Sequence, residues 1–219
     1  MLGIIYGSEY TNSPAKSNVA SISFVGTVVG QLVFGYTSDK WSRRNSLLVS
    51  TIILFVFTAL CAGSYGAGGS IEGLFAALTA YRFFLGIGIG GEYPAGSVSA
   101  AEASGELKSG TRNFWFIMFT NVAIDWGFVI GAFVPYVVVL ITTTDHLRLA
   151  WRLSLGLGVV PPLLLFLLRL KLNEPEEFKR ESMKHVSIPY GLVLKYYWWR
   201  LFVVGLIWFL YDVSSLFFT

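Results

Sequence analysis

The chain has 219 residues, of which 54% are hydrophobic and only 13% are charged. A soluble domain carries about 25% charged residues, so this composition excludes an ordinary soluble fold and indicates a protein of the lipid bilayer. The net charge of +3 gives no indication of a nucleic-acid partner. The one cysteine, Cys61, excludes a disulfide framework, and we expect neither a metal nor a cofactor.

Six stretches are apolar over about 20 residues, the length that crosses the hydrocarbon core of a bilayer. They predict an all-α membrane protein. In chain order the predicted spans are Val19–Ser38, Leu47–Tyr65, Leu74–Ser97, Phe114–Ile141, Ala150–Leu168 and Trp199–Phe218. The fourth is so long that we expect it to tilt or to project beyond the bilayer.

The loops between these spans alternate in positive charge. Lys and Arg gather in the first, third and fifth loops, and the fifth covers residues 169–198. The positive-inside rule places these three loops in the cytoplasm and the N-terminus outside. An outside N-terminus favours a further span before Met1, with Leu2–Tyr6 as its tail, and an apolar run also ends at Thr219. We therefore expect the chain to be incomplete at both ends.

The third span carries two charges, Arg82 and Glu92, in an otherwise apolar helix. Charges in hydrocarbon are costly, so they usually face a water-filled path or a partner charge. Glu92 has two interpretations: a desolvated carboxyl that takes up and releases a proton, or a structural group paired with a basic or hydroxyl side chain. Arg82 either holds an anionic substrate or pairs with an acid such as Asp125.

Other polar residues within the spans recur at helical spacing. Ser23, Thr27 and Gln31 lie four residues apart, on one helix face, and Gly26 and Gly30 beside them form a small-xxx-small pair. The pattern suits either a polar path, with Gln31 as a donor to substrate, or simple helix packing.

The fourth and sixth spans also hold polar residues. Asn121 and Asp125 are four residues apart in the fourth, and Asp212 lies in the sixth. Intramembrane carboxylates are functional candidates by default, although helix-pairing partners are common. Tyr93 shares a face of the third span with Arg82, and its hydroxyl can donate to a phosphate oxygen or simply pack.

A charged motif, Gly35-Tyr-Thr-Ser-Asp39-Lys-Trp-Ser-Arg43-Arg44, follows the first span. Asp39 can accept hydrogen bonds from helix-terminal amides or from the basic groups after it. Gly35 allows close packing against a neighbouring helix. The motif therefore predicts a latch that holds two helices together at the cytoplasmic face; a plain positive-inside anchor is the alternative.

This motif resembles the signature loop between the second and third helices of the major facilitator superfamily, with Ser42 where that family usually has glycine. The third span resembles the fourth helix of the phosphate:proton symporter branch, which more often has Asp at the position of Glu92. The whole pattern looks closest to fungal glycerophosphoinositol permeases. The further residues that match are Tyr93, Pro94, Asn121, Asp125, Gly127, Trp151, Arg152, Gly156, Pro161, Arg169, Glu174, Pro175, Glu176, Trp208 and Asp212.

The resemblance implies a major facilitator-type bundle of about twelve spans in two halves, of which this chain holds helices two to seven. Residues 1–18 are then an extracellular segment, 19–168 the N-terminal half-bundle, 169–198 the cytoplasmic linker and 199–219 the first helix of the second half.

The implied function is proton-coupled uptake of an anionic, phosphate-containing solute, in the plasma membrane. The proton-coupling candidates are Glu92, Asp125 and Asp212. The substrate-binding candidates are Arg82, Tyr93, Gln31 and Asn121, and the latch comprises Gly35, Asp39, Arg43 and Arg44.

The sequence leaves two alternative functions open and disfavours an enzyme. A truncated, non-transporting membrane protein has the same composition, and a relative that carries carboxylates or sugars suits a path with one arginine equally well. An enzyme is not expected, because the two histidines, His146 and His185, fall in loops on opposite sides of the membrane and no nucleophile lies beside a base.

Overall fold

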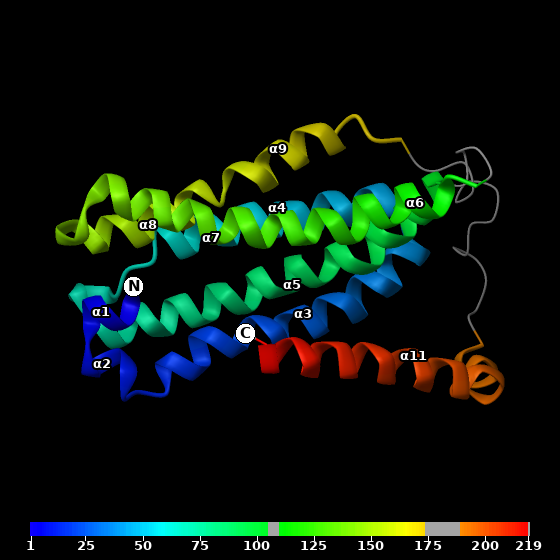
Figure 1. Cartoon of the computed structure of the whole chain (residues 1–219), viewed down its shortest axis with the longest axis horizontal. Helices are drawn as coiled ribbons and strands as arrows, with labels where there is room; N and C mark the ends of the chain where they lie inside the picture. The colour runs from blue at the N-terminus through cyan, green and yellow to red at the C-terminus, as the bar shows by residue number, and fades with distance from the viewer. Residues whose placement is uncertain (105–109, 174–188, 219) are drawn as a thin grey trace. The chain divides into compact units, whose positions relative to one another are not determined.

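The structure, a computed structural model, describes residues 1–104, 110–173 and 189–218 (Figure 1). Regular structure in these ranges is helical throughout. The chain divides into two units, Met1–Lys184 and His185–Thr219, which are described separately below. Six helices or helix pairs are long and apolar enough to cross a membrane, which confirms the predicted all-α membrane fold.

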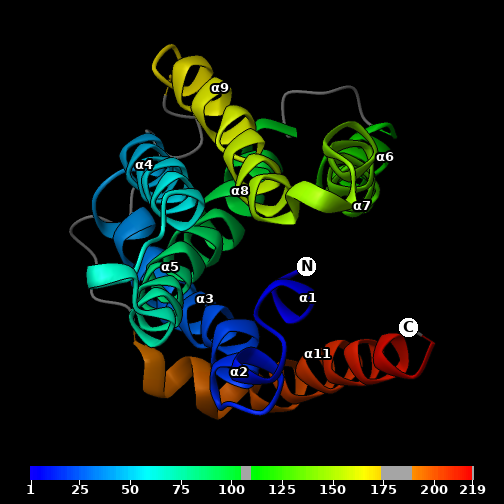
Figure 2. The ribbon, with the colours of Figure 1, turned by 90° about the vertical axis from the view of Figure 1, so that its left-hand side faces the viewer.

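The first unit begins with two short helices, α1 (Leu2–Tyr6) and α2 (Ser8–Thr11), before the first membrane-length helix, α3 (Ala15–Lys40). Next come α4 (Arg43–Ala62), the 3₁₀ turn η1 (Ala67–Gly69) and α5 (Ile71–Ser104). The long helices α3, α4 and α5 run side by side (Figures 1 and 2), and α5 packs against both of the others. The C-terminal end of α5 lies beyond the predicted span end at Ser97, so Glu102 belongs to this helix.

Glycines bring α3 and α5 into backbone contact. A Cβ atom added to Gly26 would lie 2.1 Å from the Phe83 carbonyl oxygen, and one on Gly30 would lie 2.2 Å from that of Ile87. The relation is mutual, because Gly86 and Gly90 of α5 approach carbonyl oxygens of α3 equally closely. No side chain larger than hydrogen fits these positions, which confirms the predicted small-xxx-small packing.

The fourth membrane-length segment is not a uniform helix. It consists of α6 (Arg112–Ile117), the π-helical turn η2 (Met118–Val122) and α7 (Ala123–Thr142). Its large apolar side chains point outward: Phe128 is 75% exposed and Ile141 76% exposed. A soluble fold would bury such side chains, whereas a bilayer solvates them.

The fifth segment is also broken. After the 3₁₀ turn η3 (Thr144–His146), α8 (Leu147–Leu157) ends at Gly158 and α9 (Val160–Arg169) begins two residues later. Pro161 and Pro162 lack the amide hydrogens that would continue the helical ladder, and they occupy the first turn of α9, where no donor is needed. The predicted span Ala150–Leu168 is thus two helices.

The second unit is described through one helix, α11 (Tyr190–Phe218). It begins before the predicted span start at Trp199. Its membrane-length stretch, Gly191–Leu210, buries none of its residues within the structure.

Candidate functional site

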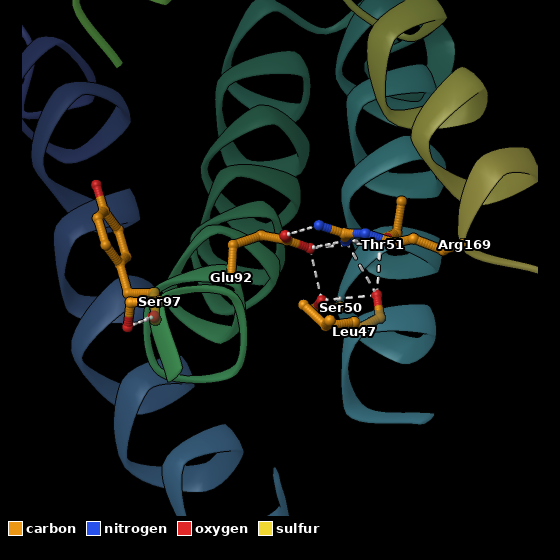
Figure 3. A network of polar contacts seen from close by, with 7 residues as sticks. Leu47, Ser50, Thr51, Glu92, Ser97 and Arg169 are labelled. Atoms are coloured by element: carbon orange, nitrogen blue, oxygen red, sulfur yellow. Dashed lines mark hydrogen bonds and ion pairs between the residues drawn. The ribbon is translucent and has the colours of Figure 1, made fainter. Parts of the chain in front are cut away.

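A carboxylate and a guanidinium meet where α4, α5 and α9 converge (Figure 3). Arg169 of α9 donates to Glu92 of α5 through both terminal nitrogens, Nη2 to Oε2 at 2.6 Å and Nη1 to Oε1 at 2.7 Å. From α4, Ser50 Oγ donates to Glu92 Oε1 at 2.6 Å. Arg169 Nη1 also donates to Thr51 Oγ1 and, at 3.2 Å, to the Leu47 carbonyl oxygen. Figure 3 shows these groups pointing toward one another from the three helices.

This ion pair is well desolvated. The side chains of Arg169 and Glu92 are 17% and 25% exposed, respectively. Bidentate arginine–carboxylate bonds are among the strong polar contacts of proteins, since both partners are charged and the geometry is fixed. The arrangement therefore ties three helices together.

The pairing matches the second interpretation of Glu92, a structural group bonded to a basic and a hydroxyl side chain. The sequence analysis names Arg169 among the residues of the family resemblance but assigns it no site, because a basic residue at the end of a span looks like a positive-inside anchor. A second signal is its position directly after an apolar run, at the last residue of α9.

The latch motif forms a second charged cluster, at the adjoining ends of α3 and α4. Arg43 donates to Asp39 at 2.5 Å and to Ser38 Oγ at 2.9 Å. Its other terminal nitrogen reaches Glu102 of α5 at 3.2 Å. Asp39 thus meets a basic side chain, one of the two options expected for it, and Glu102 is a partner that the sequence reading missed.

The remaining latch residues contribute differently. Arg44 donates to the Leu170 carbonyl oxygen just after α9, at 2.8 Å, so the first turn of α4 is also tied to the fifth segment. A Cβ on Gly35 would lie 3.8 Å from Pro94 Cβ, an ordinary van der Waals distance. Close packing therefore does not require glycine at position 35, contrary to the expectation for this residue.

Arg82 lies apart from both clusters. It lines a cavity of about 440 Å³ together with residues of α1, α4, α7 and α8, among them Trp151. The alternative pairing of Arg82 with Asp125 is not found: both residues are described, and no ion pair joins them. Tyr93, although predicted to share a helix face with Arg82, is not among the residues that line this cavity.

Tyr93 and Gln31 occupy neighbouring stretches of α5 and α3. A Cβ on Gly90, one turn before Tyr93, would lie 2.9 Å from the Gln31 backbone nitrogen. Both side chains are exposed on this unit, Tyr93 by 48%. The two residues thus come from stretches of α5 and α3 that pack against each other, whereas Glu92 points toward α4.

The other candidates are more scattered. Asn121 lies in the π-helical turn η2 and Asp125 in the first turn of α7, and both are exposed. π-Helical turns often occur at functional sites, because they interrupt the regular hydrogen-bond ladder. Asp212 lies in α11, but its side chain is outside the described residues. Over the described ranges, no group of three or more His, Cys, Asp or Glu could hold a metal ion.

Sequence comparisons with known proteins identify the family of the chain. The profile of the family described as "Sugar (and other) transporter" matches residues 5–186. The glycerophosphocholine permease GIT4 of Candida albicans is 53% identical over 96% of this chain, and the glycerophosphoinositol transporter 1 of Saccharomyces cerevisiae 35% identical over 94%. An inorganic phosphate transporter, PT2 of Toxoplasma gondii, is 31% identical over 91% of this chain and 34% of its own length. The chain spans about 40% of the length of the two permeases.

A solved structure shares the fold. The inward-open xylose transporter XylE from E. coli superposes with a TM-score of 0.70, at 20% identity, over 89% of this chain and 46% of that protein. The family match covers most of the sequence, including all five membrane-length segments of the first unit. The chain belongs to the sugar (and other) transporter family, within the major facilitator superfamily.

Proposed function

We propose that the protein is a secondary active transporter that couples proton movement to the uptake of an anionic, phosphate-containing solute. The solute class is inorganic phosphate or a glycerophosphodiester such as glycerophosphoinositol. The names of the most similar relatives, which include permeases for glycerophosphocholine and glycerophosphoinositol, support this class. A plasma-membrane location follows from uptake from the medium.

The observation that carries the proposal is the ion pair between Arg169 and Glu92, a carboxylate within the membrane-length helix α5. Glu92 lies ten residues before Glu102, or about 15 Å along the axis of α5 at 1.5 Å per residue. An ionised carboxylate at that depth is costly unless it has a partner or a function. A titratable group held by one basic partner is what proton coupling requires, because a proton and Arg169 compete for the same oxygens.

The contacts of Arg169 make this competition feasible. When a proton binds Glu92, the guanidinium loses its counter-charge but keeps two acceptors on α4, the Thr51 hydroxyl and the Leu47 carbonyl oxygen. The arginine is therefore not left without partners. Asp125 and Asp212 remain the alternative proton carriers. Of the two, the side chain of Asp125 is described, and no ion pair joins it to a basic group.

Solute binding is assigned to donors away from this pair. Tyr93 and Gln31 come from packed stretches of α5 and α3 and offer a hydroxyl and an amide. Asn121, in the π-helical turn, offers a second amide, and Arg82 offers the charge that attracts an anion. In the proposed layout the first five spans form the N-terminal half-bundle, residues 19–168, residues 169–198 form the linker and 199–219 begin the second half. The latch of Asp39, Arg43 and Arg44 favours one conformation of the N-terminal half-bundle.

Uptake measurements test the proposal. Cells that express the whole protein should accumulate labelled glycerophosphoinositol or phosphate faster at pH 5 than at pH 7.5. Glu92→Gln should abolish this pH dependence and leave exchange of bound solute intact, whereas Glu72→Gln, an exposed carboxylate on the same helix, should change neither. A normal pH profile in Glu92→Gln would assign Glu92 a purely structural function.

Two other candidate functions have distinct signatures. A carrier of carboxylates or sugars would accumulate those solutes and ignore phosphate esters in the same assay. A non-transporting membrane protein would accumulate none of them at either pH.

A further inference from the structure

The charged cluster at Glu92 and the latch cluster are joined by a polar face of α5. The residues of this face are spaced three, four and three apart, which aligns them along the helix: Glu92, Ala95, Ser99 and Glu102. Ala95 is fully buried and carries only a methyl group. The face therefore runs from one carboxylate to another, with a small residue and a hydroxyl between them.

A matching face of α4 lies opposite. It comprises Arg43, Ser46 and Ser50, spaced three and four residues apart. Two contacts fix how the faces meet: Ser50 Oγ donates to Glu92 Oε1 at 2.6 Å (Figure 3), and Arg43 Nη2 donates to Glu102 Oε1 at 3.2 Å. The lower-numbered end of one face thus meets the higher-numbered end of the other, so Ser46 falls between the two contacts.

Polar atoms between these contacts are buried without a hydrogen-bond partner. Ser46 is 1% exposed, and its Oγ bonds to nothing among the described residues. Ser99 Oγ and Glu102 Oε2 are likewise buried, and neither has a partner in that part of the chain. A buried hydroxyl that bonds to nothing costs free energy, which a bridging water would recover.

The spacing suits bridges of one water each. Side chains three or four residues apart on a helix have Cβ atoms about 5–6 Å apart, and this applies to Ser46 with Ser50 and to Ser99 with Glu102. One water joins oxygens about 5 Å apart, which is nearly twice the length of an O–H···O hydrogen bond. Hydroxyl groups and water both donate and accept hydrogen bonds. The two faces can therefore carry one continuous chain of hydrogen bonds.

We propose that Ser50, Ser46 and Ser99, with bound water, conduct a proton between Glu92 and Glu102. The path rests on the proposed function above, in which Glu92 takes up and releases the proton. Each oxygen accepts a proton on one side and passes its own hydrogen on, so only O–H bonds form and break. Glu92 regains its charge and both bonds to Arg169, and the carboxylate of Glu102 receives the proton.

Charged groups stand at the two ends of this path. Arg169 of α9 faces Glu92, and Arg43 faces Glu102 while it also bonds to Asp39 of α3. The hydroxyls between the ends are uncharged. Glu102 lies in the last turn of α5, and its side chain is 16% exposed, so it can pass the proton to water.

Time-resolved infrared spectroscopy after a rapid drop in pH tests the path, with the whole protein in phosphatidylcholine nanodiscs. The signal of the Glu92 carboxyl is the band that vanishes in Glu92→Gln. Ser46→Ala should slow protonation of Glu92 about tenfold, the effect of about one hydrogen bond lost from the transfer step, and should leave the final protonated fraction unchanged. Ser99→Ala should act alike, and Ser46→Thr, which keeps the hydroxyl, should restore most of the rate.

The matched control is Ser64→Ala. Ser64 is also 1% exposed with a buried, unpartnered Oγ among the described residues, but it lies beyond the opposite end of α4. Its replacement should change neither the rate nor the protonated fraction. Thermal unfolding establishes that each variant is folded, and Ser99→Ala tests the same path from the other helix if Ser46→Ala does not fold.

Three outcomes would overturn the path: an unchanged rate in both Ser46→Ala and Ser99→Ala, an equal slowing in Ser64→Ala, or a Glu92 carboxyl that takes up no proton while the protein is folded. The proposed function is decided separately, by uptake. Uptake that depends on pH, with equal protonation rates in all variants, would remove the path and leave the transporter. Slowed protonation in Ser46→Ala without any pH-dependent uptake would do the reverse.

Discussion

The ion pair between Glu92 and Arg169 makes the most exacting prediction, because it fastens helices that are far apart in the sequence. The change is a double-mutant cycle: Glu92→Gln, Arg169→Gln and both together. Glutamine keeps the shape of the carboxylate and most of the length of the arginine, so each single variant removes charge with little loss of packing. Each also leaves the opposite charge in a largely buried position.

The magnitude follows from the contacts. Loss of one partner of a buried ion pair costs about 3–5 kcal/mol, because the remaining charge has lost its counter-charge without regaining water. Arg169 retains Thr51 and the Leu47 carbonyl oxygen, which places Glu92→Gln at the lower end, about 3 kcal/mol. Glu92 retains the Ser50 hydroxyl at 2.6 Å and a longer contact from the Thr51 hydroxyl at 3.4 Å, so Arg169→Gln should cost a similar amount, about 3 kcal/mol. The double variant leaves no unpaired charge, so it should lower the free energy of unfolding by no more than either single variant does.

The assay is equilibrium unfolding of the purified chain in mixed micelles, with the four proteins compared at one pH and one salt concentration. The interaction free energy of the cycle should reach about 3 kcal/mol. Glu72→Gln serves as the matched control: the same chemical change at an exposed position of α5 should alter the free energy of unfolding by less than about 0.5 kcal/mol.

Additive effects would refute the reasoning. If the two single variants each destabilise the fold and the double variant loses the sum, within about 0.5 kcal/mol, the two side chains do not interact in the folded protein. The same conclusion follows if Glu92→Gln is no more destabilising than Glu72→Gln.

Three further predictions concern the rest of the first unit. Gly30→Ala should lower the free energy of unfolding by about 1–3 kcal/mol, since the new methyl group collides with a backbone carbonyl oxygen; Gly127→Ala, where nothing lies within 4 Å, should be neutral or slightly stabilising in the same measurement. Arg43→Gln should loosen the packing of α3, α4 and α5 at the ends joined by Arg43, seen as faster hydrogen exchange there; protection unchanged at Glu102 would contradict this. Tyr93→Phe should raise the KM for uptake about fivefold with an unchanged unfolding midpoint, because the exposed hydroxyl bonds to solute and not to the fold; an unaltered KM would remove Tyr93 from the binding site.

The helices could be predicted from the sequence because membrane insertion is a local property. Each predicted span overlaps a membrane-length helical segment, since about 20 apolar residues suffice to define one. The breaks inside the fourth and fifth segments were harder to foresee. Pro161 and Pro162 mark the break in the fifth segment, although the length of the apolar run does not show it. The π-helical turn at Met118–Val122 has no comparably clear marker in the sequence.

Contacts between residues close in sequence could also be predicted. Asp39 and Arg43 are four residues apart, and the short connection between α3 and α4, with Ser42 extended, leaves them close enough to pair. Arg43 with Glu102 and Glu92 with Arg169 join residues 59 and 77 positions apart. No local pattern specifies which of several basic residues meets a given carboxylate, because that choice depends on how the helices pack.

The glycine contacts between α3 and α5 restrict how the protein can move. Helices that meet through backbone atoms alone have no flexible side chains between them to absorb a change of angle. Their Cα–H groups also face carbonyl oxygens, which gives each contact a weak directional preference. These two helices should therefore travel as one rigid body in any cycle of opening and closing. We expect any bending to occur where a helical ladder is already interrupted, as it is between α8 and α9.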